Sequence, residues 1–238
     1  MSRTFKLHQD PYGTGEKLFK RKKITINPGV TVLVGCNGAG KTTLLRSIET
    51  QLKENKIPVL KYDNLHDGGG RAVSFAAASG DIQFAATAAM SSEGENIVMN
   101  LGRVASSLRP FIRTGETPDR SDKLAKAFAR AVWGDAADKE DEKIPKERWL
   151  FFDAVDSGLS IDNVVDVKEY LFKTILEDAG DCDVYILVTA NAFEVARGEE
   201  CFDVYEGKYR TFKTYEAYRK FILNSRAKKN TREACSAE

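Results

Sequence analysis

The sequence predicts an α/β fold around a mainly parallel β-sheet, with antiparallel strands near the N-terminus. An apolar, β-branched run at 31–34 is followed by a glycine-rich loop and then by a helix with an apolar stripe at about 43–55. Residues 184–188 are almost entirely apolar, as expected for a parallel strand that helices cover on both faces. Residues 22–27 alternate polar and apolar side chains before a Pro-Gly turn, which indicates an antiparallel strand.

The remaining elements follow from the same patterns. Short strands are expected at 59–62, 149–152, 202–205 and 209–212, the last two joined by a turn at Glu206-Gly207-Lys208. Helices are expected at 96–112, 121–133 and 161–177, and a closing helix from a cap at Thr214 to Ile222. We therefore predict one domain at 1–225, with a small helical insertion at about 85–147, and a disordered polar tail at 226–238.

The composition excludes several classes of protein. The 238 residues are 42% hydrophobic and 30% charged, with a formal net charge of +1, so no global field attracts nucleic acid or a membrane. No apolar run is long enough to span a bilayer. The two histidines, His8 and His66, are too few for a histidine-based zinc cluster. Four cysteines without a CxxC pair indicate free thiols, so we expect a cytoplasmic protein without a membrane partner.

Within the stretch GCNGAGKTT at 35–43, residues 35–42 fit the phosphate-binding loop (P-loop) pattern G-x-x-x-x-G-K-[ST]. Its glycines allow a tight turn whose N–H groups point at phosphate, and the helix that follows adds affinity for anions. Lys41 is long enough to reach the β- and γ-phosphates of a nucleotide, and the Thr42 hydroxyl can bind Mg²⁺. The residues expected to bind nucleotide here are Asn37, Gly38, Ala39, Gly40, Lys41, Thr42 and Thr43. The sequence therefore predicts a P-loop NTPase fold.

A second stretch, RWLFFDAVDSGLS at 148–160, resembles the Walker B strand and D-loop of ATP-binding cassette (ABC) ATPases. The P-loop is also similar to the ABC form, with Asn37 and Thr43 as the discriminating positions. The resemblance implies ATP and Mg²⁺ as cofactors. It also implies that Asp153 binds the metal ion together with Thr42.

A third stretch, SSEGEN at 91–96, resembles the ABC signature in the form that the SMC and RecF branch uses. In that family the signature of one subunit contacts the γ-phosphate bound by the other. The resemblance thus implies a homodimer in the ATP-bound state, with Ser92, Gly94 and Glu95 at the nucleotide. The same residues also fit a plain helix start, in which Ser92 is the cap and Glu95 the third helical residue.

Two groups usual in ABC hydrolysis are missing. The glutamate that activates water is replaced by Ala154, which cannot accept a proton. The switch-loop histidine is also absent, since the chain runs Thr189-Ala190-Asn191 there. Asn191 can still donate a hydrogen bond to phosphate or water.

Asp156 is the candidate replacement for the missing carboxylate. Two interpretations stay open. Asp156 is either a catalytic carboxylate, which approaches the water from another backbone position or acts across a dimer interface, or a turn-capping residue before Ser157-Gly158. The expected catalytic set is therefore Lys41, Asp153 and Asp156.

The pattern resembles small stand-alone cassettes of bacteria and phages. It implies Mg²⁺-dependent ATP binding, slow or partner-dependent hydrolysis, and ATP-driven dimerisation as a switch towards an unknown protein or nucleic-acid partner. The alternatives are a non-hydrolysing nucleotide-binding interaction module and an SMC/RecF-like DNA-associated ATPase. A transporter subunit is disfavoured, because the segment between Lys41 and Ser92 is short.

Overall fold

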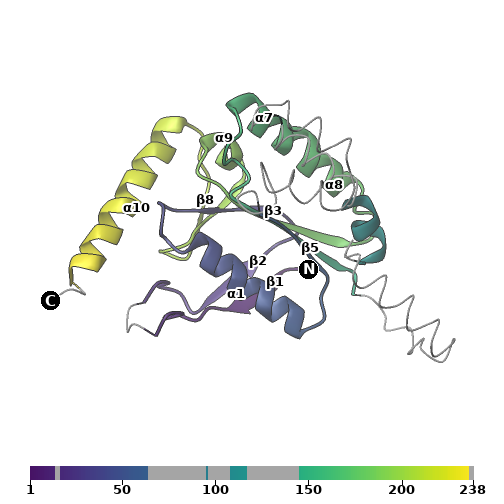
Figure 1. The fold of residues 1–238 in the computed structure, drawn as a ribbon, viewed down its shortest axis with the longest axis horizontal. Helices are drawn as coiled ribbons and strands as arrows, with labels where there is room; N and C mark the ends of the chain where they lie inside the picture. The colour runs from purple at the N-terminus through teal and green to yellow at the C-terminus, as the bar shows by residue number, and fades with distance from the viewer. Residues whose placement is uncertain (14–16, 64–94, 96–107, 117–144, 236–238) are drawn as a thin grey trace, which may run out of the picture.

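The structure, a computed structural model, describes residues 1–13, 17–63, 95, 108–116 and 145–235. Its main sheet has six strands in the order β4-β5-β6-β3-β7-β8. The strands are β3 (Gly29–Val34), β4 (Val59–Asp63), β5 (Glu147–Asp153), β6 (Asp183–Thr189), β7 (Glu200–Asp203) and β8 (Lys208–Arg210). All neighbouring pairs are parallel except β7–β8. The predicted α/β fold with a mainly parallel sheet is thus confirmed (Figure 1).

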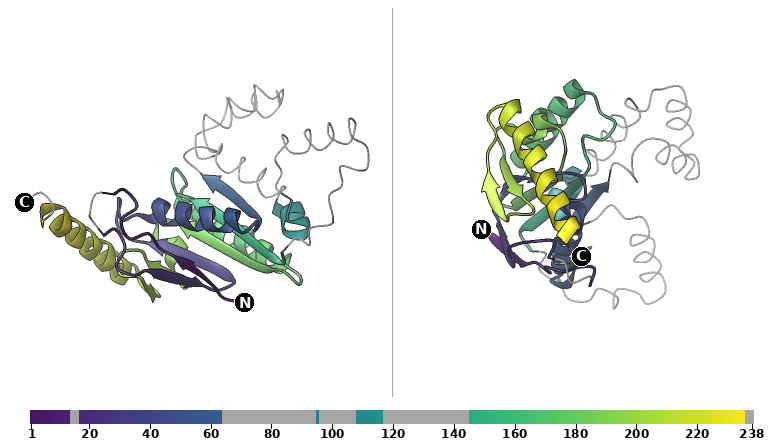
Figure 2. Two further views of the ribbon diagram at one scale, coloured as in Figure 1. Left: turned by 90° about the horizontal axis from the view of Figure 1, so that it is seen from below. Right: turned by 90° about the vertical axis from the view of Figure 1, so that its left-hand side faces the viewer.

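Helices cover both faces of this sheet because its buried strands are apolar on both sides. Trp149 and Phe151 of β5 pack on one face, together with the apolar side of α1 (Lys41–Glu54). Leu150 and Phe152 pack on the other face, against residues from 108–114 and from the helices between 161 and 222. Figures 1 and 2 show α1 and the helices α7 to α9 on opposite sides of the sheet.

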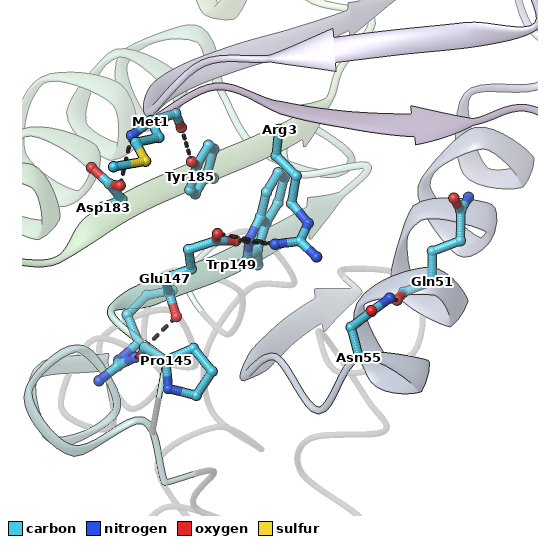
Figure 3. A network of polar contacts seen from close by, with 10 residues as sticks. Met1, Arg3, Gln51, Asn55, Pro145, Glu147, Trp149, Asp183 and Tyr185 are labelled. Carbon is cyan, nitrogen blue, oxygen red and sulfur yellow. Dashed lines mark hydrogen bonds and ion pairs between the residues drawn. The ribbon is translucent and has the colours of Figure 1, made fainter. Parts of the chain in front are cut away.

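The predicted N-terminal antiparallel strands are confirmed, and they form a separate two-stranded sheet. In this sheet β1 (Arg3–Lys6) pairs with β2 (Lys23–Ile26). Arg3 Nη1 donates to both carboxylate oxygens of Glu147, each at 2.9 Å. Met1 contacts Asp183 and Tyr185 of β6 (Figure 3). These contacts attach the small sheet to β5 and β6.

The helix expected at 161–177 is present in three successive stretches. They are α7 (Ile161–Asp166), a π-helical segment η2 (Val167–Phe172) and α8 (Lys173–Glu177). A short helix, α9 (Phe193–Ala196), lies between β6 and β7. The last hairpin begins and ends about two residues earlier than predicted, because its turn occupies 204–207.

The tail prediction is wrong for the described residues, since α10 runs from Tyr215 to Cys235. The predicted start is confirmed, because Ala217 N donates to Thr214 Oγ1 at 3.3 Å. The helix passes the predicted end at Ile222 because its polar second half has partners: Ser225 accepts from the P-loop and Lys228 binds Glu206. A polar helix can therefore be held in place by hydrogen bonds and ion pairs along one side, without an apolar stripe.

Part of the predicted insertion lies outside the described residues. This holds for the helix at 121–133 and for most of the one at 96–112; residues 108–114 of the latter are helical. Ser92 and Gly94 also lie outside, whereas Glu95 is described and exposed. The boundaries of the insertion stay a prediction.

The pairing of Glu206 with two lysines makes the docking of α10 sensitive to acid. Glu206 binds Lys228 Nζ at 2.6 Å and Lys20 Nζ at 3.0 Å. The hydrogen bond from Lys228, followed by that from Lys20, lowers the pKa of Glu206 from 4.5 to about 2. A lowered carboxyl pKa stabilises the fold above the unfolded-state pKa, and this contribution is lost as the pH falls towards the folded-state value.

We therefore expect Glu206→Gln to lower the melting temperature at neutral pH, with the difference from wild type shrinking as the pH falls from about 5 to about 2. Thermal melting across this range measures it. The control is Glu216→Gln, whose carboxylate is exposed and lies 3.7 Å from Arg219. An equal, pH-independent effect of both substitutions would contradict the assignment.

Candidate functional site

The P-loop joins β3 to α1 in the conformation that the sequence predicts. Gly40, the residue before α1, has φ 94°, and a Cβ there would lie 2.8 Å from Leu18 Cδ2. Glycine is therefore the residue that fits both the left-handed backbone and the close contact. No side-chain hydrogen bond caps α1, and its first turn has no acidic residue. Its first amides are thus not neutralised by a side chain of their own helix, which suits an anion.

Lys41 lies folded over this loop. Its Nζ donates to Gly35 O at 2.8 Å, to Cys36 O at 3.3 Å and to Asn191 Oδ1 at 3.1 Å. Burial lowers the pKa of Lys41, while the nearby acidic groups of Cys36, Asp156 and Asp153 act in the opposite direction. The contact with Asn191 ties the P-loop to the loop that follows β6.

The two predicted metal ligands meet at the C-terminal edge of the sheet. Thr42 Oγ1 donates to Asp153 Oδ1 at 3.2 Å, although the two residues are 111 positions apart in the chain. Asp153 is buried, with 4% of its surface exposed, at the end of β5. Thr189 was not predicted, and it too donates to Asp153 Oδ1, at 2.6 Å. Thr189 also accepts from Ala154 N at 2.7 Å, so it positions the Asp153 carboxylate.

These donors fit Mg²⁺ bound together with phosphate. Within the described parts of the chain, no three His, Cys, Asp or Glu side chains form a metal cluster. Mg²⁺ commonly takes one or two protein oxygens and completes its shell with water and substrate phosphates. One carboxylate from Asp153 and one hydroxyl from Thr42 match that requirement.

Asp156 contacts the loop that follows β6 through one of its two carboxylate oxygens. Its Oδ2 accepts from Asn191 N at 2.7 Å and from Ala192 N at 2.6 Å. Ala192 is the N-cap residue of α9, so Asp156 fixes the loop between β6 and α9. The turn before Gly158 is closed by a backbone bond from Ser157 N to Ala154 O instead. This carboxylate therefore lies against the loop that contains Asn191.

A cavity of about 270 Å³ opens between these groups. It is lined by Tyr12, Leu18, Asn37, Gly38, Gly40, Lys41, Thr42, Thr43, Asp153, Ala154, Thr189 and Asn191. Most predicted nucleotide-binding residues thus share one cavity, whereas Ala39 is buried and does not line it. Ala154 contributes only a methyl group at the point where a general base would be expected. Its φ of 52° is unusual for a residue other than glycine.

Tyr12 and Phe19, two of the aromatic residues before the P-loop, differ in access to the cavity. Tyr12 is 69% exposed, and its hydroxyl lies 2.7 Å from Thr43 Oγ1. Phe19 is 1% exposed and belongs to the core below the loop. Sequence alone gives no reason to choose between them, because both are aromatic residues at a similar distance from Gly35.

No protein family model matches the sequence, and no curated protein matches it. Among solved structures, the chain is similar to the crystal structure of a nucleotide-free ATP-binding cassette from an ABC transporter. The two are 14% identical, the match covers 94% of this chain and 95% of that chain, and the TM-score is 0.43. Across the described residues, no helix is both long and apolar enough to cross a bilayer.

Proposed function

We propose that this protein binds ATP with Mg²⁺ in the manner of ABC-type P-loop proteins and hydrolyses it slowly or only with a partner. The observation that carries the proposal is the contact between Thr42 and Asp153 at the mouth of the P-loop, beside the amine of Lys41. A glycine loop alone would bind many anions. A hydroxyl and a buried carboxylate that meet beside it add a magnesium site, and phosphate with Mg²⁺ indicates a nucleoside polyphosphate.

Tyr12 offers a stacking surface for the base of the nucleotide, and the choice of adenine rests on the ABC resemblance. Tyr12 has an exposed aromatic side chain that lines the cavity and contacts Thr43, the residue directly after the P-loop pattern. An aromatic face next to a phosphate site can stack on a purine ring. Phe19 is excluded from this role by its burial.

The proposal that hydrolysis is slow rests on the residues expected around the terminal phosphate. Ala154 has no group that activates water, and Asn191 stands where a histidine is usual. A missing general base lowers a rate by roughly 10²–10⁴. We assign Asp156 a positioning role: it holds the backbone of Asn191, whose side chain contacts Lys41. Only Oδ2 of Asp156 accepts from these two amides, and Oδ1 is buried without a hydrogen-bond partner among the described residues, so a catalytic role for this carboxylate stays the alternative.

We propose that the protein acts by forming a dimer when it binds ATP. The stretch at 91–96 resembles an ABC signature, so Ser92, Gly94 and Glu95 of a second copy would complete the site over the γ-phosphate. Formation of this dimer on ATP binding does not require fast hydrolysis, which agrees with the lack of a general base at Ala154. The second candidate function is a non-hydrolysing nucleotide-binding module, which Ala154 also favours. It differs from the first proposal only in that ATP is never hydrolysed.

Equilibrium ATP binding and sedimentation velocity, with Mg²⁺ or with EDTA, test the proposal in wild type and Asp153→Asn. We expect wild type to bind ATP more tightly with Mg²⁺ and to sediment as a dimer in that state. The Asp153→Asn substitution keeps the size of the side chain but not its charge, so the gain from Mg²⁺ is expected to fall by about tenfold or more. The affinity in EDTA changes little, which shows an intact P-loop. Equal Mg²⁺ dependence in both proteins would overturn the metal assignment.

A further inference from the structure

The second half of α10 lies against the P-loop. Cys36 N, within the loop, donates to Ser225 Oγ at 3.2 Å. Lys229 follows one helical turn later, and a Cβ built on Gly38 would lie 2.6 Å from Lys229 Nζ. Figure 1 shows α10 (yellow) at the edge of the molecule on the side where α1 begins. A lysine from the far end of the chain thus reaches the loop predicted to bind phosphate.

The helix that carries Lys229 is fixed along its length. Near its start, the Tyr218 hydroxyl donates to Asn191 O at 2.9 Å. Further on, Lys228 Nζ binds Glu206, which Lys20 also binds. Successive residues on an α-helix point about 100° apart. Lys228 therefore holds α10 to the β7–β8 turn, while the next side chain points towards the P-loop.

Gly38 gives Lys229 the room to approach. Its φ of 77° disfavours a larger residue at this position, and the Lys229 amine lies where a Cβ would be. Lys229 is half-buried, whereas its neighbour Lys228 is exposed. Gly38 also lines the cavity between Lys41 and Asp153. The amine therefore lies next to a residue that borders the phosphate position.

We propose that Lys229 is a second cation for the phosphate chain of the bound nucleotide, supplied by α10 beside Lys41. The inference rests on the proposed ATP binding and names a further binding residue for it. Two cations at one loop attract a triphosphate more strongly than a diphosphate, because the triphosphate carries more negative charge. Lys229 thus favours ATP over ADP, and its position makes α10 part of the nucleotide site.

The test is isothermal titration of the full chain with ATP and with ADP, in Mg²⁺, for wild type, Lys229→Gln and Lys229→Arg. We expect Lys229→Gln to lower ATP affinity about five- to tenfold and ADP affinity less, with Lys229→Arg close to wild type. The matched control is Arg226→Gln, which removes the same charge from an exposed position of the same helix. It is expected to change ATP affinity less than about twofold, because solvent screens an exposed charge.

The outcomes separate this inference from the proposed function. If wild type binds neither nucleotide, the proposed function fails. If wild type binds ATP but Lys229→Gln and Arg226→Gln behave alike, only the role of Lys229 is overturned. A gain of ATP affinity in Lys229→Gln would also overturn it, since the lysine would then compete with nucleotide for the loop. Thermal melting of each variant shows whether α10 stays docked, so a loss of fold is not mistaken for a loss of binding.

Discussion

Replacing Ala154 with glutamate is expected to raise the rate of ATP hydrolysis by roughly 10²–10⁴, the usual contribution of a general base. Ala154 lines the cavity directly after Asp153, so a carboxylate added there can reach a water beside the terminal phosphate. The substitution adds no new backbone strain. Position 154 already has a φ of 52° in wild type, and alanine has a Cβ as glutamate does. Phosphate release from ATP with Mg²⁺ measures the effect.

The control for this prediction is Ala154→Gln, which has the size of glutamate without the ability to accept a proton. We expect its rate to stay near that of wild type. If Ala154→Glu gains nothing while still binding ATP, the missing carboxylate does not limit the reaction. A wild-type rate as high as that of ordinary ABC ATPases would likewise contradict the role given to Ala154.

Replacing Lys41 with alanine is expected to weaken ATP binding by about ten- to a hundredfold, since a hydrogen bond to a charged group contributes roughly 1.5–3 kcal/mol. The Lys41 amine now binds two carbonyls of the P-loop and Asn191, and it would exchange them for phosphate oxygens. Burial lowers its pKa, so ATP binding is also expected to weaken with rising pH before an ordinary lysine would lose its proton. Calorimetric titration measures both effects.

Lys53→Ala is the matched control, because Lys53 lies on the same helix and binds Glu49 at 2.6 Å on the exposed side. Its ATP affinity and pH dependence are expected to match wild type. Equal affinities of Lys41→Ala and wild type would mean that nucleotide, if bound, lies elsewhere on the molecule.

Patterns with a local physical cause could be predicted from the sequence. The apolar runs of β3, β5 and β6 identify buried parallel strands, and the P-loop pattern identifies the turn between β3 and α1. The meeting of Thr42 and Asp153 is what the resemblance to ABC ATPases implies, and it occurs at the edge of the sheet where the parallel strands end.

Contacts that depend on tertiary packing could not be predicted. The length of α10 depends on Ser225 and Lys228 finding partners near residues 36 and 206, which no local pattern reveals. The polar composition of 226–238 is common to exposed tails and to helices that dock along one side. Thr189 and the true partners of Asp156 were missed for the same reason, because hydroxyls and carboxylates at strand ends have many possible neighbours.

The most direct test of slow hydrolysis after ATP binding is the identity of the nucleotide that stays on the protein. Wild type is mixed with radiolabelled ATP and Mg²⁺, separated from free nucleotide at successive times, and the bound label is resolved into ATP and ADP. We predict that label is retained and remains ATP for many minutes. Absence of retained label, or its conversion to ADP within seconds, would contradict the account.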